Sequence, residues 1–120
     1  MTWHISQDLG FETYDEAVDQ FEWDVPDNYN IVWDTVKKHD EKENPALFHL
    51  TPDGQRKTYS FSDLDRLSNE FADSLSSLGI GVDDRVVVMI SQHPANSVAN
   101  LANWKVGATS VLAPTLLGQE

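Results

Sequence analysis

The chain has 120 residues, enough for one domain that buries roughly 65–70% of its extended surface on folding. It carries 20 Asp and Glu residues against 8 Lys and Arg, a net charge of −12, and no cysteine, which excludes disulfides and thiolate metal sites and disfavours binding to nucleic acid. Because no apolar run approaches the roughly 18 residues of a membrane span and the N-terminus lacks a secretory signal pattern, we expect a cytoplasmic protein.

The N-terminal residues, 1–28, are predicted to be an extension with one short amphipathic helix at 14–21. Residues 29–120 are predicted to form the domain. Asn30 is placed to cap the domain's first helix, at 31–40, because an Asn side chain accepts hydrogen bonds from the free N–H groups that begin a helix. The apolar residues that share a face of this helix are Ile31, Val32 and Val36.

A β-hairpin is predicted for residues 46–50 and 56–61, because the TPDG sequence between them suits a tight turn. Ser60 and Asp63 then form a capping-box pattern, which predicts a helix over residues 62–78. We expect this helix to bury the apolar residues that recur every three or four positions, namely Leu64, Leu67, Phe71, Leu75 and Leu78.

The next stretch, LGIGVDDRVVVMI at residues 78–90, contains a Gly-x-Gly pair. In a dinucleotide-binding fingerprint the glycines follow a strand and open a helix. Here Gly79 follows the last periodic leucine, where a left-handed cap is needed, so the pair is predicted to end a helix. Residues 82–85 are predicted to turn the chain, and the apolar run at 86–90 is typical of a strand buried on both faces.

Pro94, which follows His93, suits the first turn of another helix, and Gly107 stands just past the end of that helix. The small residues on one of its faces are Ala95, Ala99, Ala102 and Val106. A last strand is predicted at 110–113. The order of elements predicts an α/β fold in which an N-terminal β-hairpin is followed by βαβαβ with parallel strands.

Ligands of open α/β sheets bind beyond the carboxyl ends of the strands, here the loops at residues 91–94 and 114–118. We interpret His93 as a helix N-cap or loop residue in preference to an acid–base catalyst, because the sequence places no nucleophile, paired carboxylate or second His beside it. The other histidines have none of the short spacings of a metal site, so no metal site is predicted; they are His4, His39 and His49.

The charged residues Asp83, Asp84 and Arg85 are interpreted as a solvated turn, with Asp83 or Asp84 able to meet a basic neighbour. Trp33 and Trp104 are interpreted as packing residues. The chain has no P-loop, Gly-x-Ser-x-Gly elbow or kinase signature. No catalytic, cofactor-binding or metal-binding residue is therefore assigned.

From about residue 29 onward, an ordered series of segments resembles the opening of the AMP-forming acyl-CoA synthetases. The segments are NIVWDTV, then PALFHLTPDGQRKTYSFSDLDRLSNEFADSLSSLGIGVDDRVVVMI, then NLANWKVGATSVLAPTLL. Each is generic, but the ordered series with matching gaps is fairly specific. NIVWDTV and the ending PTLLGQE look most like the medium-chain acyl-CoA synthetases. One departure is the Asp-Asp-Arg of residues 83–85, where relatives commonly have Gly-Asp-Arg.

This resemblance implies a reaction in which a carboxylate attacks the α-phosphate of ATP, giving an acyl-adenylate and pyrophosphate, and the CoA thiolate then displaces AMP. It implies ATP, Mg²⁺ and CoA for the full-length enzyme. In the family the ATP-binding groups come from a Ser/Thr/Gly-rich loop that ends in Lys-Gly, from later loops and from a C-terminal domain, all beyond Glu120. Residues 29–120 thus resemble a partial AMP-binding domain, expected to be inactive alone. None of the lysines present lies in such a loop; they are Lys37, Lys38, Lys42, Lys57 and Lys105.

A second interpretation stays open, in which the chain is a non-catalytic, flavodoxin-like α/β binding or interaction module. In both cases an unpaired sheet edge favours association with another chain. The excess of acids also predicts a halophilic source, because molar salt shortens the Debye length to roughly 3 Å and screens the repulsion among carboxylates. We therefore expect the thermal stability to rise with salt.

Overall fold

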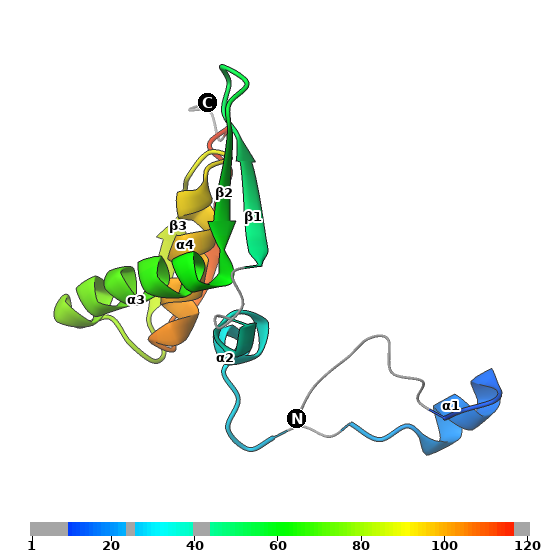
Figure 1. Cartoon of the computed structure of the whole chain (residues 1–120). Coiled ribbons are helices and arrows are strands. Elements are labelled where there is room, and N and C mark those ends of the chain that lie inside the picture. Colours follow the sequence, from blue (N-terminus) through cyan, green and yellow to red (C-terminus); the bar gives the residue numbers. More distant parts are fainter. Residues whose placement is uncertain (1–9, 24–25, 40–43, 117–120) are drawn as a thin grey trace.

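The computed structural model describes residues 10–23, 26–39 and 44–116 (Figure 1). Its elements, in chain order, are α1 (Tyr14–Gln20), α2 (Ile31–Thr35), the 3-10 helix η1 (Lys37–His39), β1 (Pro45–Leu50), β2 (Arg56–Ser60), α3 (Phe61–Ser77), β3 (Arg85–Val88), α4 (Pro94–Lys105) and β4 (Thr109–Leu112). The predicted helix α1 is present, but it lies apart from the other elements in Figure 1 and buries no residue. The core is therefore built from α2 onward. Among the described helices, none is both long and apolar enough to cross a membrane.

The hairpin of β1 and β2 is antiparallel, as the sequence predicts. In its turn the Thr51 N–H donates to the Gln55 carbonyl oxygen at 2.9 Å, and Gly54 has a φ of +83°, a conformation in which other residues are strained. The Arg56 guanidinium lies 4.0 Å from the centre of the exposed Phe48 ring, in a cation–π contact. The predicted hairpin is confirmed.

The strands β3 and β4 form a parallel pair, with Val87 opposite Val111, and α4 is the crossover between them. Both strands begin one position earlier than predicted. In the described part of the chain β2 pairs only with β1, so the prediction of a continuous βαβαβ sheet is wrong and the molecule has two separate two-stranded sheets. The reason is that α3 packs mainly against α4 and does not return β3 to the edge of β2.

Within the described residues, α4 packs against only one face of the β3–β4 sheet. Asn103 of α4 donates from Nδ2 to Ser110 Oγ at 2.8 Å, which places α4 over the face that carries Ser110 and its register partner Val86. Side chains alternate along a strand, so the opposite face, here called the outer face, carries Arg85, Val87, Thr109 and Val111. Val87 is 62% exposed. The expectation that this apolar strand is buried on both faces is therefore wrong for this chain.

Both ends of α3 have the caps that the sequence predicts. Ser60 Oγ accepts the N–H of Asp63 at 3.1 Å, and the Asp63 carboxylate accepts the N–H of Ser60 at 3.0 Å, which completes the capping box. At the other end, Gly79 has a φ of +82°, and the N–H groups of Gly79 and Ile80 donate back to carbonyls of the last turn. The Gly-x-Gly pair therefore ends a helix, as predicted.

The buried face of α3 matches the predicted one only in part, since Leu64 and Leu75 are buried as predicted but other members of the series are not. Phe71 is 38% exposed and Leu78 is 79% exposed, although both belong to the periodic apolar series. The helix instead turns Ala72 toward α4, where it packs with the fully buried Ala102. The residues that α3 buries are Leu64, Asp65, Ser68, Ala72 and Leu75. The face of α3 that carries small residues is the one turned toward α4, because small side chains allow two helices to approach closely.

Asn30 caps α2 as predicted and also ties it to α4. Its Oδ1 accepts the N–H of Val32 at 2.9 Å, and its Nδ2 donates to the Trp104 carbonyl oxygen at 3.2 Å. Val32 and Val36 are buried as expected, whereas Ile31 is exposed and does not share their environment. The main apolar cluster combines Val32 and Val36 with Leu64 of α3 and Leu101 of α4.

A buried carboxylate joins α3, α4 and η1. Asp65 is only 7% exposed, its Oδ1 lies 2.7 Å from Lys105 Nζ, and its Oδ2 lies 3.1 Å from Lys37 Nζ. Lys105 Nζ also donates to the Asn69 Oδ1 at 2.7 Å. Burial raises the pKa of Asp65, but the hydrogen bonds from Lys105 and Lys37 outweigh burial, so this pKa lies below its ordinary value of 3.8.

The corrected phase of α3 predicts unequal effects for two leucines three positions apart. Leu75→Ala should lower the free energy of unfolding by about 2–5 kcal/mol, because it leaves a cavity in the core. Leu78→Ala should change it by less than about 0.5 kcal/mol, because Leu78 faces solvent. Urea unfolding followed by circular dichroism measures both. Equal losses of unfolding free energy for the two variants would mean that Leu78 is buried, as the leucine periodicity predicts.

Asp65 predicts a contribution to stability that depends on pH. Because its pKa is lowered in the folded chain, the contribution is present above the ordinary pKa of 3.8 and is lost as the pH falls through the lower, folded-state pKa. Asp65→Asn should cost about 1.5–3 kcal/mol at neutral pH and should flatten the loss of stability in acid. Asp73→Asn, an exposed position on the same helix, is the control. Urea unfolding at several pH values that gives Asp65→Asn the same acid slope as the unsubstituted chain contradicts the assignment.

Candidate functional site

The loop after β3 borders a hollow of about 390 Å³ between the hairpin and the start of α4. This is the loop at residues 91–94 to which the sequence rule points. Its polar lining comes from both sides of the hollow: His49 of β1, and Gln92, His93, Asn96 and Ser97 around the start of α4. The hollow therefore offers imidazole and amide groups, and no residue that lines it is a carboxylate or a lysine.

His93 is the N-cap of α4, as the sequence predicts. Its Nδ1 accepts the N–H of Ala95 at 3.1 Å, so this nitrogen carries no proton in the observed arrangement. Pro94 occupies the first turn, where a missing N–H costs nothing. The His49 ring lies edge-on to the His93 ring, with 5.3 Å between ring centres. The lining includes one hydroxyl, that of Ser97, but among the described residues no hydrogen bond joins it to either imidazole, as an activated nucleophile would require.

Sequence reasoning did not connect His49 with His93. The two residues are 44 positions apart, and only the packing of the hairpin beside α4 brings them together. No local spacing in the sequence signals this. His39 instead contacts the Phe61 ring, at 5.3 Å between centres, and His4 lies outside the described residues. In the ranges that the structure describes, no three His, Asp or Glu side chains converge as a metal site would require.

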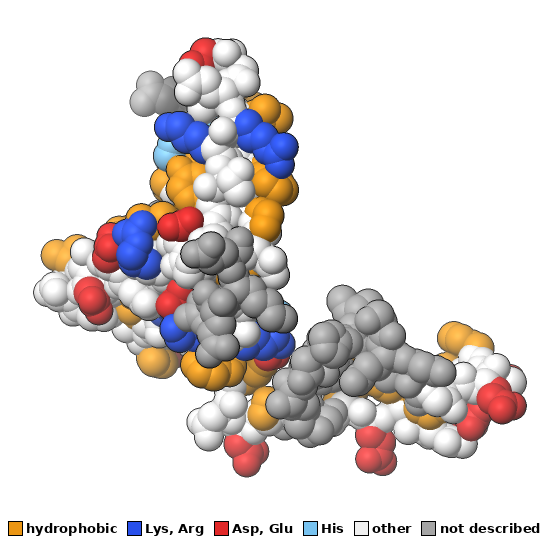
Figure 2. All heavy atoms as spheres, in the orientation of Figure 1, with side chains coloured by type: hydrophobic (Ala, Val, Ile, Leu, Met, Phe, Trp, Pro, Cys, Tyr) orange, Lys and Arg blue, Asp and Glu red, His pale blue; other side chains and the backbone are white. Residues whose placement is uncertain are grey.

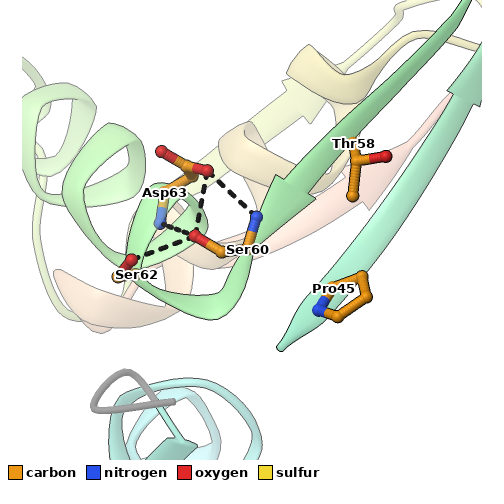
Figure 3. A pocket seen from close by; sticks show the side chains of 5 residues that line it. All are labelled: Pro45, Thr58, Ser60, Ser62 and Asp63. Carbon is orange, nitrogen blue, oxygen red and sulfur yellow. Dashed lines mark hydrogen bonds between the residues drawn. The ribbon is translucent and has the colours of Figure 1, made fainter. Parts of the chain in front are cut away.

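A second hollow, of about 400 Å³, lies where β2 meets α3 (Figure 3). Ser60 Oγ lies 3.0 Å from Ser62 Oγ and donates to the Asp63 carboxylate at 2.9 Å. The Ser60 N–H and then the Ser60 hydroxyl lower the pKa of Asp63. No histidine lines this hollow to activate a serine, and the groups satisfy one another as a helix cap. We assign it a structural role.

The Asp83, Asp84 and Arg85 segment forms the predicted turn. Asp84 Oδ2 accepts the N–H of Gly81 at 2.8 Å, so its partner is the backbone and not a basic side chain. Asp83 has a φ of +70°, a left-handed conformation that Asp tolerates better than most residues. The second predicted loop, residues 114–118, is described only as far as Leu116, which is exposed. The described residues of this loop, 114–116, do not line the first hollow.

The tryptophans and lysines serve the fold and its surface. Trp104 borders an apolar hollow of about 460 Å³ with Val36 and Leu64, whereas Trp33 is exposed, so its predicted packing role is wrong.

Lys37 and Lys105 bind Asp65. Lys38 pairs with Asp34 at 2.8 Å, and Lys42 lies outside the described residues. Figure 2 shows the acidic side chains scattered over the visible face and not gathered in one patch.

The geometry of His93 predicts that its role in the hollow is capping. His93→Ala should lower the free energy of unfolding by about 1 kcal/mol, because the Ala95 N–H loses its acceptor. His93→Asn should restore most of this loss, since Asn is a good N-cap residue. Urea unfolding measures both variants. If Asn is as destabilising as Ala, the ring contact with His49 and not the cap accounts for the contribution of His93.

Comparison with known proteins gives a consistent result. Residues 33–120 match the family described as AMP-binding enzyme. The human mitochondrial acyl-coenzyme A synthetase ACSM3 is 27% identical over an aligned length of 118 residues, gaps included, and the alignment covers 92% of this chain and 20% of that protein. The acetyl-coenzyme A synthetase of Laribacter hongkongensis is 32% identical over an aligned length of 90 residues, and the alignment covers 73% of this chain and 14% of that protein.

The fold also matches a solved structure. The Brucella canis acyl-CoA synthetase superposes with a TM-score of 0.78 and 22% identity, over 90% of this chain and 22% of that one. The chain thus spans about a fifth of the length of these acyl-CoA synthetases. Because the family match extends over most of the sequence, the chain belongs to the AMP-binding enzyme family.

Proposed function

We propose that this chain forms the first segment of the AMP-binding domain of an acyl-CoA synthetase of the medium-chain type, and that this segment alone does not form an acyl-adenylate. The observation that carries the proposal is the coverage: ACSM3 aligns with 92% of this chain, yet the chain accounts for only 20% of ACSM3. The ATP, Mg²⁺ and CoA of the reaction are accordingly proposed for the whole enzyme and not for these residues.

The described side chains support the second part of the proposal. In adenylation a carboxylate attacks the α-phosphate of ATP, and the phosphate oxygens carry negative charge in the transition state. Stabilising that charge requires cationic side chains or N–H donors aimed at these oxygens. None of the residues lining the three hollows is a lysine or an arginine. Lys105 and Lys37 are paired with the buried Asp65, although the side chain of Lys37 stays 42% exposed. The contribution of this segment is therefore the packed unit of α3, α4 and the parallel strands.

The isolated chain should show no exchange of pyrophosphate into ATP, with or without a medium-chain carboxylate, because the hollows in its described part present no lysine or arginine to the phosphate charge. An ATP–pyrophosphate exchange assay measures this, with the Brucella canis enzyme as the positive control. Exchange that depends on the carboxylate would contradict the proposed inactivity of the segment.

A chimera tests the structural part of the proposal. In it, this chain replaces the superposed segment of the Brucella canis enzyme. The chimera should fold and form AMP with the carboxylate that the parent enzyme uses. A chimera without activity contradicts the assignment of this chain to an acyl-CoA synthetase.

A further inference from the structure

We propose that His49 and His93 together bind a divalent transition-metal ion, such as Zn²⁺ or Cu²⁺, in the hollow between the hairpin and the start of α4. The site does not depend on the function proposed above. The two imidazoles come from different elements, and the packing of β1 beside α4 leaves 5.3 Å between their ring centres. Imidazole nitrogen is a preferred ligand of both metals.

The separation of the two rings suits a shared metal ion. With Zn–N bonds of about 2.0–2.1 Å at a tetrahedral angle, the centres of two coordinated imidazoles lie about 5.2 Å apart. The observed separation is 5.3 Å. The planes of the rings are inclined by 73° to each other. This inclination is compatible with coordination, because each ring can turn about its own metal–nitrogen bond without changing the angle at the metal.

His93 can offer only its Nε2 while it caps α4, because its Nδ1 accepts the N–H of Ala95 at 3.1 Å. A neutral imidazole has one unprotonated nitrogen, so Nε2 coordinates only when the ring carries its proton on Nδ1. Nε2 then releases a proton to water and Nδ1 takes one up, with no net change. The protonated Nδ1 no longer accepts from Ala95. Metal binding and helix capping therefore compete for the same ring.

The lining of the hollow makes this an open and selective site. A closed structural zinc site takes four protein ligands, and no third His, Asp or Glu joins this pair among the described residues. Gln92 and Asn96 add amide groups, and water fills the remaining positions. Because Mg²⁺ prefers carboxylate oxygen, a hollow without carboxylates should select transition metals over Mg²⁺. Lys57, the register partner of His49, carries a charge that opposes a bound cation.

Isothermal titration calorimetry of the chain with ZnCl₂, in an excess of MgCl₂, tests the site. His93→Asn keeps an N-cap acceptor but removes the ring, and His49→Gln keeps a polar side chain. Each should weaken Zn²⁺ binding about tenfold or more. Lys57→Glu should tighten it severalfold, since it replaces the opposing charge with a carboxylate. His4→Gln and His39→Gln are the controls and should leave the affinity unchanged. Circular dichroism verifies that each variant is folded.

Amide hydrogen exchange tests the competition for His93. Zn²⁺ should accelerate exchange of the Ala95 N–H, because its acceptor is withdrawn. Zn²⁺ binding that leaves this exchange unchanged contradicts the competition.

The other results that overturn the site concern affinity. A chain that binds no Zn²⁺ has two rings that only pack against each other. Binding that excess Mg²⁺ abolishes belongs to the surface carboxylates. Binding that persists in His49→Gln and His93→Asn, or that a control variant weakens equally, belongs to other groups.

Discussion

The contact of Asp65 with Lys105 and Lys37 fixes how the helices of this chain sit together. A carboxylate that is 7% exposed is costly unless cations and hydrogen bonds compensate it. Here the compensation comes from the end of α4 and from η1, so all three elements must hold their positions at once. In a chain of net charge −12, two of the few cations are committed to one acid in the interior.

Small residues make this ion pair possible. Ser68 is fully buried and its hydroxyl donates to the Leu64 carbonyl oxygen at 2.6 Å, so it satisfies its own polar group within α3. Ala72 and Ala102 then let α3 and α4 approach closely. A larger side chain at either alanine would separate the helices and move Lys105 away from the Asp65 carboxylate. The close packing of the alanines and the ion pair of Asp65 therefore both require the same face of α3 to meet α4. The spacing of the leucines alone does not identify this face.

The features that depend on residues close together in the chain are predicted correctly from the sequence. The features that depend on contacts between distant segments are not. The caps of Asn30, Ser60, Gly79 and His93 are all confirmed, because each requires only a few adjacent backbone groups. Periodicity also locates most helices and strands, although the single helix predicted at 31–40 is an α-helix only to Thr35 and is followed by the 3-10 helix η1. The phase of α3, the separation of the two sheets and the meeting of His49 with His93 depend on segments far apart in the chain, and no local pattern encodes them.

The excess of acidic residues and the exposed apolar outer face have opposite effects on association between copies of the chain. Negative charge keeps copies of the chain apart in dilute salt, even though Val87 and Val111 present apolar surface to solvent. Added salt screens the carboxylates, which favours the compact state, but it also removes the repulsion that keeps apolar faces from meeting. The Asp65 pair is screened less than the surface acids because it is partly buried. Added salt is therefore expected to strengthen the fold and, at the same time, the association of exposed apolar faces.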